Sequence, residues 1–306
     1  MMDTTVRIEA AGRDEAAVKA AVDNALSSFQ AVADETDRYK NASARGLFQL
    51  NAHAGQGPFV AGPHLFSLAQ MAHEQSFTEF DATLVPLIDL WRQHGAAKTV
   101  PSKEEIAARL LLTGKDKLSI DQHRQTITLS AGAGLDLGAA AKGYAVDLAA
   151  DVLAKDKNIA SALINAGGNI KTVGTKTDGK PWRIALQHPR RPGNYLGIIQ
   201  LNAQEAIATS GDYQRYYEID GIRYHHILDP HTGKPAYNAI SVTIVTPSAL
   251  LADYYSTLLF VLPHEKALEV LATHPETAAI IVKPNQEIYI SPSLQSRFEA
   301  TSAGGK

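Results

Sequence analysis

Cysteine is absent from the 306 residues, so the chain forms no disulfide and has no thiolate nucleophile. Any metal ion must therefore be bound by oxygen or imidazole ligands, and oxygen ligands favour magnesium or calcium. An excess of charge of either sign is also absent, because the formal net charge is −3. This weak charge argues against nucleic acid and anionic membranes as partners.

Long apolar runs are missing too. No segment approaches the roughly 20 apolar residues that span a bilayer, and the first residues, Met1 to Val6, lack the apolar core of a signal peptide. We therefore expect the chain to be soluble as it stands, and a mature form of an exported protein would look the same. The motifs HExxH, GxGxxG, GxSxG and the P-loop lysine are absent, which argues against zinc proteases, Rossmann enzymes, serine hydrolases and P-loop NTPases.

Helix and strand patterns are both present, and strands dominate the second half. Ser102 with Glu105 is a capping-box signature, Ser248 is a candidate helix cap, and Asp220-Gly221 is a strong hairpin turn. The expected helices cover residues 14–32, 63–76, 102–112 and 248–262, and a further Ala-rich helix, which residues 136–138 lead into, runs through residue 153. The expected strands cover 4–10, 117–120, 126–129, 160–164, 182–186, 196–201, 214–219, 222–228 and 240–246. A further helix and two strands close the chain, and residues 38–57 are expected to form a loop. These patterns predict an α+β protein with mixed sheets, as a single domain with a soft internal division near residues 100–130.

Two segments concentrate polar chemistry in the second half. Ala208 to Tyr213 combines small residues with the carboxylate of Asp212, and a histidine pair follows at His225 and His226. This combination favours a phosphate-handling site over a packed core. Because neighbouring side chains of a strand point to opposite faces, the two histidines cannot chelate one ion together. One of them is expected to face the site, and a purely structural role for a strand histidine stays open.

Small residues also mark two turns. Asp136 to Tyr144 places Gly and Ala at a helix start, where backbone amides, the helix dipole and Lys142 favour a phosphate, although such a pattern more often serves close packing. The glycines in Asn165 to Asn169 allow a ligand to approach the backbone, or form a plain turn.

One helical pair has the oxygen chemistry of a magnesium site. Asp253 and Thr257 lie four residues apart and therefore on one face of the expected helix. A carboxylate and a hydroxyl suit Mg²⁺, although such a pair is also typical of a solvated face.

Together, these segments resemble the ApbE family of FAD:protein FMN transferases, in order and over nearly the whole chain. The resemblance is carried by five matches: Asp136 to Tyr144, Asn165 to Gly168, Ser210 to Tyr213, His226 to Gly233, and Ala252 to Thr257. It implies a two-part, T-fold-related architecture with mixed and antiparallel sheets, flanking helices and an FAD site between the parts. The chain departs from the family pattern at Glu79, at Ala82, at Asn169 (where Asp is frequent) and at Tyr254-Tyr255.

The resemblance also implies the site residues. The metal ligands for Mg²⁺ would be the side chains of Asp253 and Thr257 and the carbonyl of Ala139. The FAD contacts would be Met2, Tyr39, Phe80, Asp81, Ala82, Asp136, Lys142 and Ile227. His226 is the candidate general base, and Asp212 would orient it or take its place.

The implied reaction transfers the FMN moiety of FAD to a Thr or Ser hydroxyl of an acceptor protein and releases AMP. The expected acceptors are membrane redox subunits that carry a flavinylation motif, and the expected location is the periplasm, with a lipid anchor in the full-length form. Two alternatives stay open: a Mg²⁺-dependent FAD pyrophosphatase that yields FMN and AMP, and a non-catalytic FAD-binding protein.

Overall fold

The computed structural model describes residue 2 and residues 4–301. These residues form two compact units, and the chain passes between them more than once. The first unit contains residues up to Gln30, Lys142–Tyr213 and the residues from Tyr237 onward, and the second contains Ala31–Ala141 and Gln214–Ala236. The chain changes unit after Gln30, Ala141, Tyr213 and Ala236, whereas the sequence placed a soft division near residues 100–130.

A seven-stranded sheet with the order β1-β5-β6-β9-β12-β13-β14 forms the centre of the first unit, and its neighbouring strands are antiparallel. Its strands are β1 (Val6–Gly12), β5 (Ile159–Ala166), β6 (Asn169–Gly174), β9 (Ala206–Gly211), β12 (Ser241–Thr246), β13 (Ala278–Val282) and β14 (Ile288–Ile290). A second sheet consists of β15 (Phe298–Ala300), β8 (Tyr195–Leu201) and β7 (Trp182–Gln187). Every residue of β12 is buried, as expected for a central strand that is covered on both faces.

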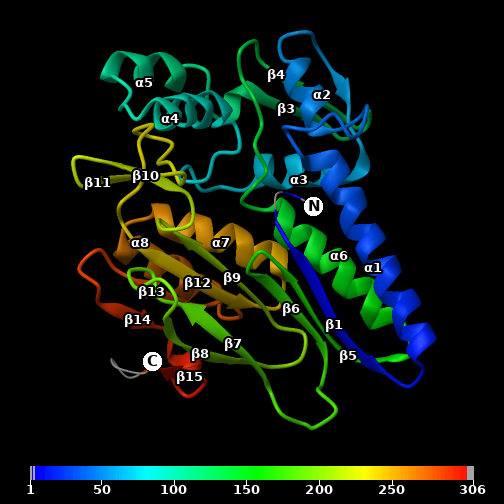
Figure 1. Cartoon of the computed structure of the whole chain (residues 1–306). Helices are drawn as coiled ribbons and strands as arrows, with labels where there is room; N and C mark the ends of the chain where they lie inside the picture. The colour runs from blue at the N-terminus through cyan, green and yellow to red at the C-terminus, as the bar shows by residue number, and fades with distance from the viewer. Residues whose placement is uncertain (1, 3, 302–306) are drawn as a thin grey trace. The chain divides into compact units, whose positions relative to one another are not determined.

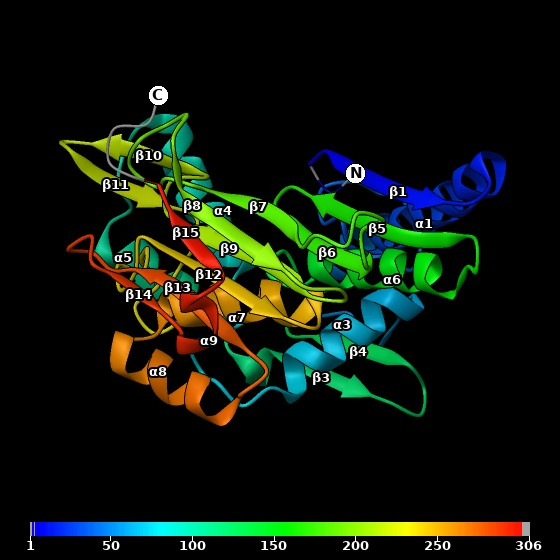
Figure 2. The same cartoon turned by 90° about the horizontal axis from the view of Figure 1, so that it is seen from below.

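Helices cover one face of this large sheet and the small sheet covers the other (Figures 1 and 2). The helices of this unit are α6 (Ala141–Lys155), α7 (Ala249–Val261), α8 (His264–Thr273) and the short α9 (Pro292–Gln295), together with the first part of α1 (Glu15–Thr36). Leu163 and Ile280 of the large sheet pack with Ile199 and Leu201 of the small sheet in one buried cluster. Helix α7 packs on β9 and β12, which places its side chains against the helix-covered face.

The second unit combines short helices with two small antiparallel sheets. Its helices are α2 (Leu47–Ala52), α3 (Pro63–Glu74), α4 (Val85–Ala97), α5 (Lys103–Leu110) and a 3₁₀ turn at Lys115–Lys117. Its strands are β2 (Phe59–Val60), β4 (Thr126–Leu129) and β3 (Leu118–Asp121), and the hairpin β10 (Tyr216–Ile219) with β11 (Ile222–His225). Leu87, Leu90, Trp91, Ile106 and Leu228 form the core between α4, α5 and the hairpin.

The predicted α+β class is confirmed, and so are three local signals. The Ser102 side chain accepts from the Glu105 amide in a full capping box, and Ser248 caps α7 by accepting from Leu251. The turn Asp220-Gly221 closes β10–β11 with positive φ at both residues. In the described part of the chain, no helix is long and apolar enough to cross a membrane.

One expectation about local structure was wrong, because residues 38–57 contain the helix α2. Helix α4 begins at Val85, and Pro86 occupies its first turn, as proline favours. Helix α6 begins at Ala141, and the residues expected to lead into it form a turn in which the Asp136 carboxylate accepts from the Gly138 amide.

Candidate functional site

A buried carboxylate on α7 lies at the centre of the candidate site in the first unit. Asp253 is 5% exposed, and its Oδ2 accepts a 3.1 Å hydrogen bond from the backbone N–H of Gly143 in the first turn of α6. The ammonium of Lys142 lies 3.4 Å from Oδ2 and 3.5 Å from Oδ1 of the same carboxylate. The structure thus brings together a predicted metal ligand and a predicted phosphate-binding lysine.

A cluster of hydroxyl groups lies about one turn further along α7 than this carboxylate. Thr257 Oγ1 lies 3.1 Å from Ser210 Oγ of β9, and Ser210 Oγ lies 2.9 Å from Ser256 Oγ. We refer to Lys142, Ser210, Asp253, Ser256 and Thr257 as the Asp253 group. One carboxylate with several hydroxyls is a hard oxygen donor set, which fits Mg²⁺. Within residue 2 and residues 4–301, no three His, Asp or Glu side chains gather into a metal-binding cluster.

Asp147 of α6 fixes the start of α7, one turn before the Asp253 group. Its Oδ1 accepts from the Ala249 amide at 2.9 Å and pairs with Lys171 Nζ at 2.7 Å, and its Oδ2 accepts from Ser248 Oγ and the Leu250 amide. No local pattern predicts this role, because the partners of Asp147 are far from it in the chain. The carboxylate joins α6, α7 and β6 at one point.

Asp212 follows β9 and forms a bidentate ion pair with Arg190. Its two oxygens each accept a 2.6 Å hydrogen bond from the guanidinium of Arg190, and the carboxylate is 6% exposed. Burial, with Asp212 beside it, raises the pKa of Tyr213 to about 12. Arg190 belongs to no motif and was missed in the sequence. The predicted catalytic role of Asp212 stays a prediction.

In the second unit, Asp136 is held by a buried arginine. Arg38 Nε lies 2.8 Å from Asp136 Oδ2, and Arg38 Nη2 lies 3.1 Å from Asp89 Oδ1. Burial opposes the charged guanidinium, but Asp136 and Asp89 outweigh it and raise the pKa of Arg38. The Asp136 amide donates to the carbonyl of Ala82 at 2.7 Å, so two of the predicted flavin contacts are directly joined.

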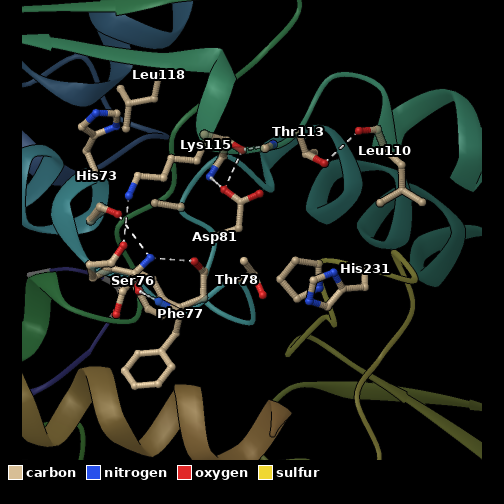
Figure 3. A pocket seen from close by; sticks show the side chains of 17 residues that line it. His73, Ser76, Phe77, Thr78, Asp81, Leu110, Thr113, Lys115, Leu118 and His231 are labelled. Atoms are coloured by element: carbon tan, nitrogen blue, oxygen red, sulfur yellow. Dashed lines mark hydrogen bonds between the residues drawn. The ribbon is translucent and has the colours of Figure 1, made fainter.

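The predicted segment Phe80–Ala82 lines a pocket of about 420 Å³ (Figure 3). Asp81 Oδ1 accepts from the amide and the hydroxyl of Thr83, at 2.7 and 2.6 Å, and therefore shapes the turn that forms the wall. Figure 3 shows Lys115 beside Asp81 and the imidazoles of His73 and His231 on opposite sides of the view.

Tyr39 and His226 line a second pocket of the same unit, with a volume of about 340 Å³. Its walls are aromatic and cationic: Trp91 and Tyr224 stack with ring centroids 5.6 Å apart, and Arg92 lies 5.2 Å from the Tyr39 ring. An aromatic wall with guanidinium groups suits a flat, conjugated ligand.

The two histidines have different environments. His225 is 3% exposed, its Nε2 lies 2.7 Å from the carbonyl of Ala236, and its Nδ1 accepts from the Ile227 amide. His226 lies just after β11, which ends before the predicted limit of residue 228, and is exposed. Its Nδ1 lies 3.2 Å from the carbonyl of Arg215. Because a carbonyl only accepts, this contact places the proton of the neutral imidazole on Nδ1 and makes Nε2 the basic nitrogen, as a general base requires.

The remaining predicted site residues are Met2, Ala139 and Ile227, and the structure describes them mainly through their backbone. Met2 is half-buried with φ of 48°, and Ala139 lies in the turn that precedes α6. Ile227 is buried, and its carbonyl accepts from the Ala236 amide. Their predicted contacts with FAD and metal stay predictions.

Comparison with known proteins identifies the family. The sequence model of the ApbE family matches residues 2–281. An FAD:protein FMN transferase from Klebsiella pneumoniae (strain 342) is 36% identical over 291 residues, which cover 92% of this chain and 90% of the relative.

Solved structures agree with this match. The ApbE protein from Thermotoga maritima superimposes with a TM-score of 0.84 at 31% identity and covers 95% of both chains. The flavin transferase ApbE from Vibrio cholerae superimposes with a TM-score of 0.78 at 30% identity and covers 96% of both chains. On this agreement of sequence and structure, the chain belongs to the ApbE family.

Proposed function

We propose that this protein is a flavin transferase that moves the FMN moiety of FAD onto a Thr or Ser hydroxyl of an acceptor protein and releases AMP. The observation that carries the proposal is the family match over residues 2–281, which includes every residue of the Asp253 group. The relatives from Klebsiella pneumoniae and Vibrio cholerae bear the name FAD:protein FMN transferase. Their name supports FAD as substrate and a protein as acceptor.

The Asp253 group supports a magnesium requirement. Asp253 and Thr257 would hold Mg²⁺, with the Ala139 carbonyl as a further ligand, and Lys142 contributes a positive charge beside the carboxylate. When bound, Mg²⁺ would neutralise the charge that develops on phosphate oxygens, an effect of several kcal/mol.

The chain's own residues account for the proton transfer. His226 Nε2 takes the proton of the acceptor hydroxyl, since its tautomer places the lone pair on that nitrogen. The hydroxyl oxygen forms a bond to the FMN-side phosphorus, the bond from that phosphorus to the bridging oxygen breaks, and AMP leaves with the electron pair. The Arg38 pair with Asp136 keeps the second unit's flavin-contact segment in place.

The test is mass spectrometry of a threonine-containing acceptor peptide after incubation with the protein, FAD and Mg²⁺, with AMP assayed in parallel. We expect a mass gain of one FMN on the threonine, matched by AMP and abolished by a chelator. AMP without peptide modification would instead indicate an FAD pyrophosphatase, and unconsumed FAD would indicate a carrier.

Asp253→Asn sharpens this test. The amide oxygen still accepts from the Gly143 N–H, so the fold is retained, but the negative charge for the cation is lost. Loss of several kcal/mol of charge stabilisation lowers metal-dependent turnover by at least about 100-fold. Turnover equal to that of the unmodified protein would refute the metal assignment. Membrane redox subunits as acceptors and a periplasmic location stay predictions.

A further inference from the structure

Asn169, the first residue of β6, is a buried polar side chain with an unmet donor. Its side chain is 3% exposed, and Nδ2 has no hydrogen-bond partner in the part of the chain that the structure describes. A buried donor without an acceptor lowers the stability of a protein by about 1–3 kcal/mol. Such a donor therefore calls for an explanation, for example a ligand that accepts from it.

The strand register places Asn169 on the helix-covered face of the large sheet. Ile170 pairs with Ile207 of β9, and both belong to the core against the small sheet. Side chains alternate along a strand, so Asn169 and Lys171 point to the other face. Lys171 confirms this direction, because its Nζ reaches Asp147 of α6.

The same register gives the position of Asn169 along α7. Lys171 lies at the start of α7, where it shares Asp147 with the Ala249 amide. Further along, Ser210 of β9 contacts Thr257 from the same face. Continuing the β6–β9 pairing by one residue places Asn169 opposite Ala208, between the positions of Lys171 and Ser210. On α7, Asp253 lies midway between Ala249 and Thr257, so Asn169 lies at the height of Asp253 along this helix.

We propose that the Asn169 amide donates a hydrogen bond to a phosphate oxygen of the ligand that binds at the Asp253 group. This inference rests on the proposed function, in which that ligand is the pyrophosphate of FAD. The Lys142 ammonium and the Gly143 amide at the start of α6 both reach the Asp253 carboxylate. The strand register places the Asn169 donor at the same level of α7, and a donor beside an ammonium suits an anionic oxygen. At this position, where Asp is frequent in the family that the chain resembles, Asn169 has an amide that can donate.

The Asp253 carboxylate determines when the phosphate binds. It lies in the same site and repels an anion, and Lys142 supplies a positive charge that partly offsets this repulsion. A divalent cation on Asp253 removes this repulsion. Asn169 therefore acts on phosphate affinity in the presence of the cation and contributes little to affinity for the cation itself.

The experiment compares Asn169→Asp and Asn169→Ala with the control Asn165→Asp. Asn165 lies in the same β5–β6 hairpin, shares a pocket with Ile170 on the opposite face, and its Oδ1 accepts from the Gly168 amide, a bond that aspartate retains. Both Asp variants add one negative charge to the hairpin. A difference in FAD affinity between them therefore reports the effect of position 169 and not of the added charge alone. Binding of FAD and of riboflavin, which has no phosphate, is titrated by flavin fluorescence with Mg²⁺, and Mn²⁺ binding alone is measured by electron paramagnetic resonance.

We expect both Asn169 variants to bind FAD about 10- to 100-fold more weakly, the range of a hydrogen bond to a charged group. Riboflavin binding and the control should be unchanged, and thermal unfolding should show that all variants are folded. Unchanged FAD affinity in Asn169→Ala would overturn the inference, even if Asn169→Asp binds weakly through repulsion. Tighter Mn²⁺ binding by Asn169→Asp with unchanged FAD affinity would assign the position to the cation and also overturn it. If the unmodified protein binds neither flavin, the proposed function fails first.

Discussion

Replacing Asp147 with Ala should loosen the start of α7 and lower the stability of the first unit. The carboxylate is 19% exposed in its side chain and pairs with Lys171, whose side chain is 15% exposed. Removing it leaves that charge without its partner, and the Ala249 and Leu250 amides without their acceptor. Breaking a buried pair costs about 3–5 kcal/mol and losing a helix cap about 0.5–2 kcal/mol. Because both groups keep some exposure, we expect a loss of about 3 kcal/mol.

The matched control is Asp151→Ala, one turn further along α6, where the side chain is exposed. Such a surface change is expected to alter the free energy of unfolding by no more than about 0.5 kcal/mol. Denaturant unfolding gives the energies, and hydrogen exchange measured by mass spectrometry reports on the peptide that contains residues 249–251. Faster exchange of this peptide in Asp147→Ala alone would support the argument. A loss below about 1 kcal/mol, or equal exchange in both variants, would refute the view that Asp147 holds α7.

Two further predictions separate structural from chemical roles. His226→Gln should reduce flavin transfer by at least about 100-fold without lowering the melting temperature. His225→Gln should instead destabilise the protein by about 1–3 kcal/mol, because both ring nitrogens of His225 are hydrogen-bonded. The reverse pattern in thermal unfolding and in peptide mass assays would contradict both assignments. The pKa of Tyr213 rises from 10.0 to about 12 on folding, so its stabilising contribution is present below pH 10 and is lost as the pH rises towards 12. Tyr213→Phe should flatten this alkaline decline in urea unfolding, and an identical decline in both proteins would show that another group causes it.

Local signals in the sequence predicted local structure well. The capping box at Ser102 involves residues three apart, and the hairpin at Asp220-Gly221 needs only two adjacent residues with positive φ. Such features depend on a few neighbouring residues, so a single sequence contains all the information they need. The Asp253–Thr257 pair was predictable for the same reason, since both residues lie on one helix.

Contacts between distant segments were not predictable from patterns. Arg190 reaches Asp212 from a loop outside any motif, and Arg38 joins Asp136 across a large part of the sequence. These ion pairs depend on how the strands and turns are placed in three dimensions. The same is true of Asn169, whose orientation became clear only through the register of β6 with β9.

Gly143 shows why packing and function are not alternatives in this protein. A Cβ atom at this position would lie 2.1 Å from the carbonyl oxygen of Ala249, so the glycine is required for the close approach of α6 and α7. The small-residue pattern before Tyr144 therefore serves packing, as one reading of the sequence held. That close approach also brings the Gly143 N–H to the carboxylate of Asp253. The glycine thus contributes to the candidate metal site through the helix contact that it allows, since the amide orients the one carboxylate in that group.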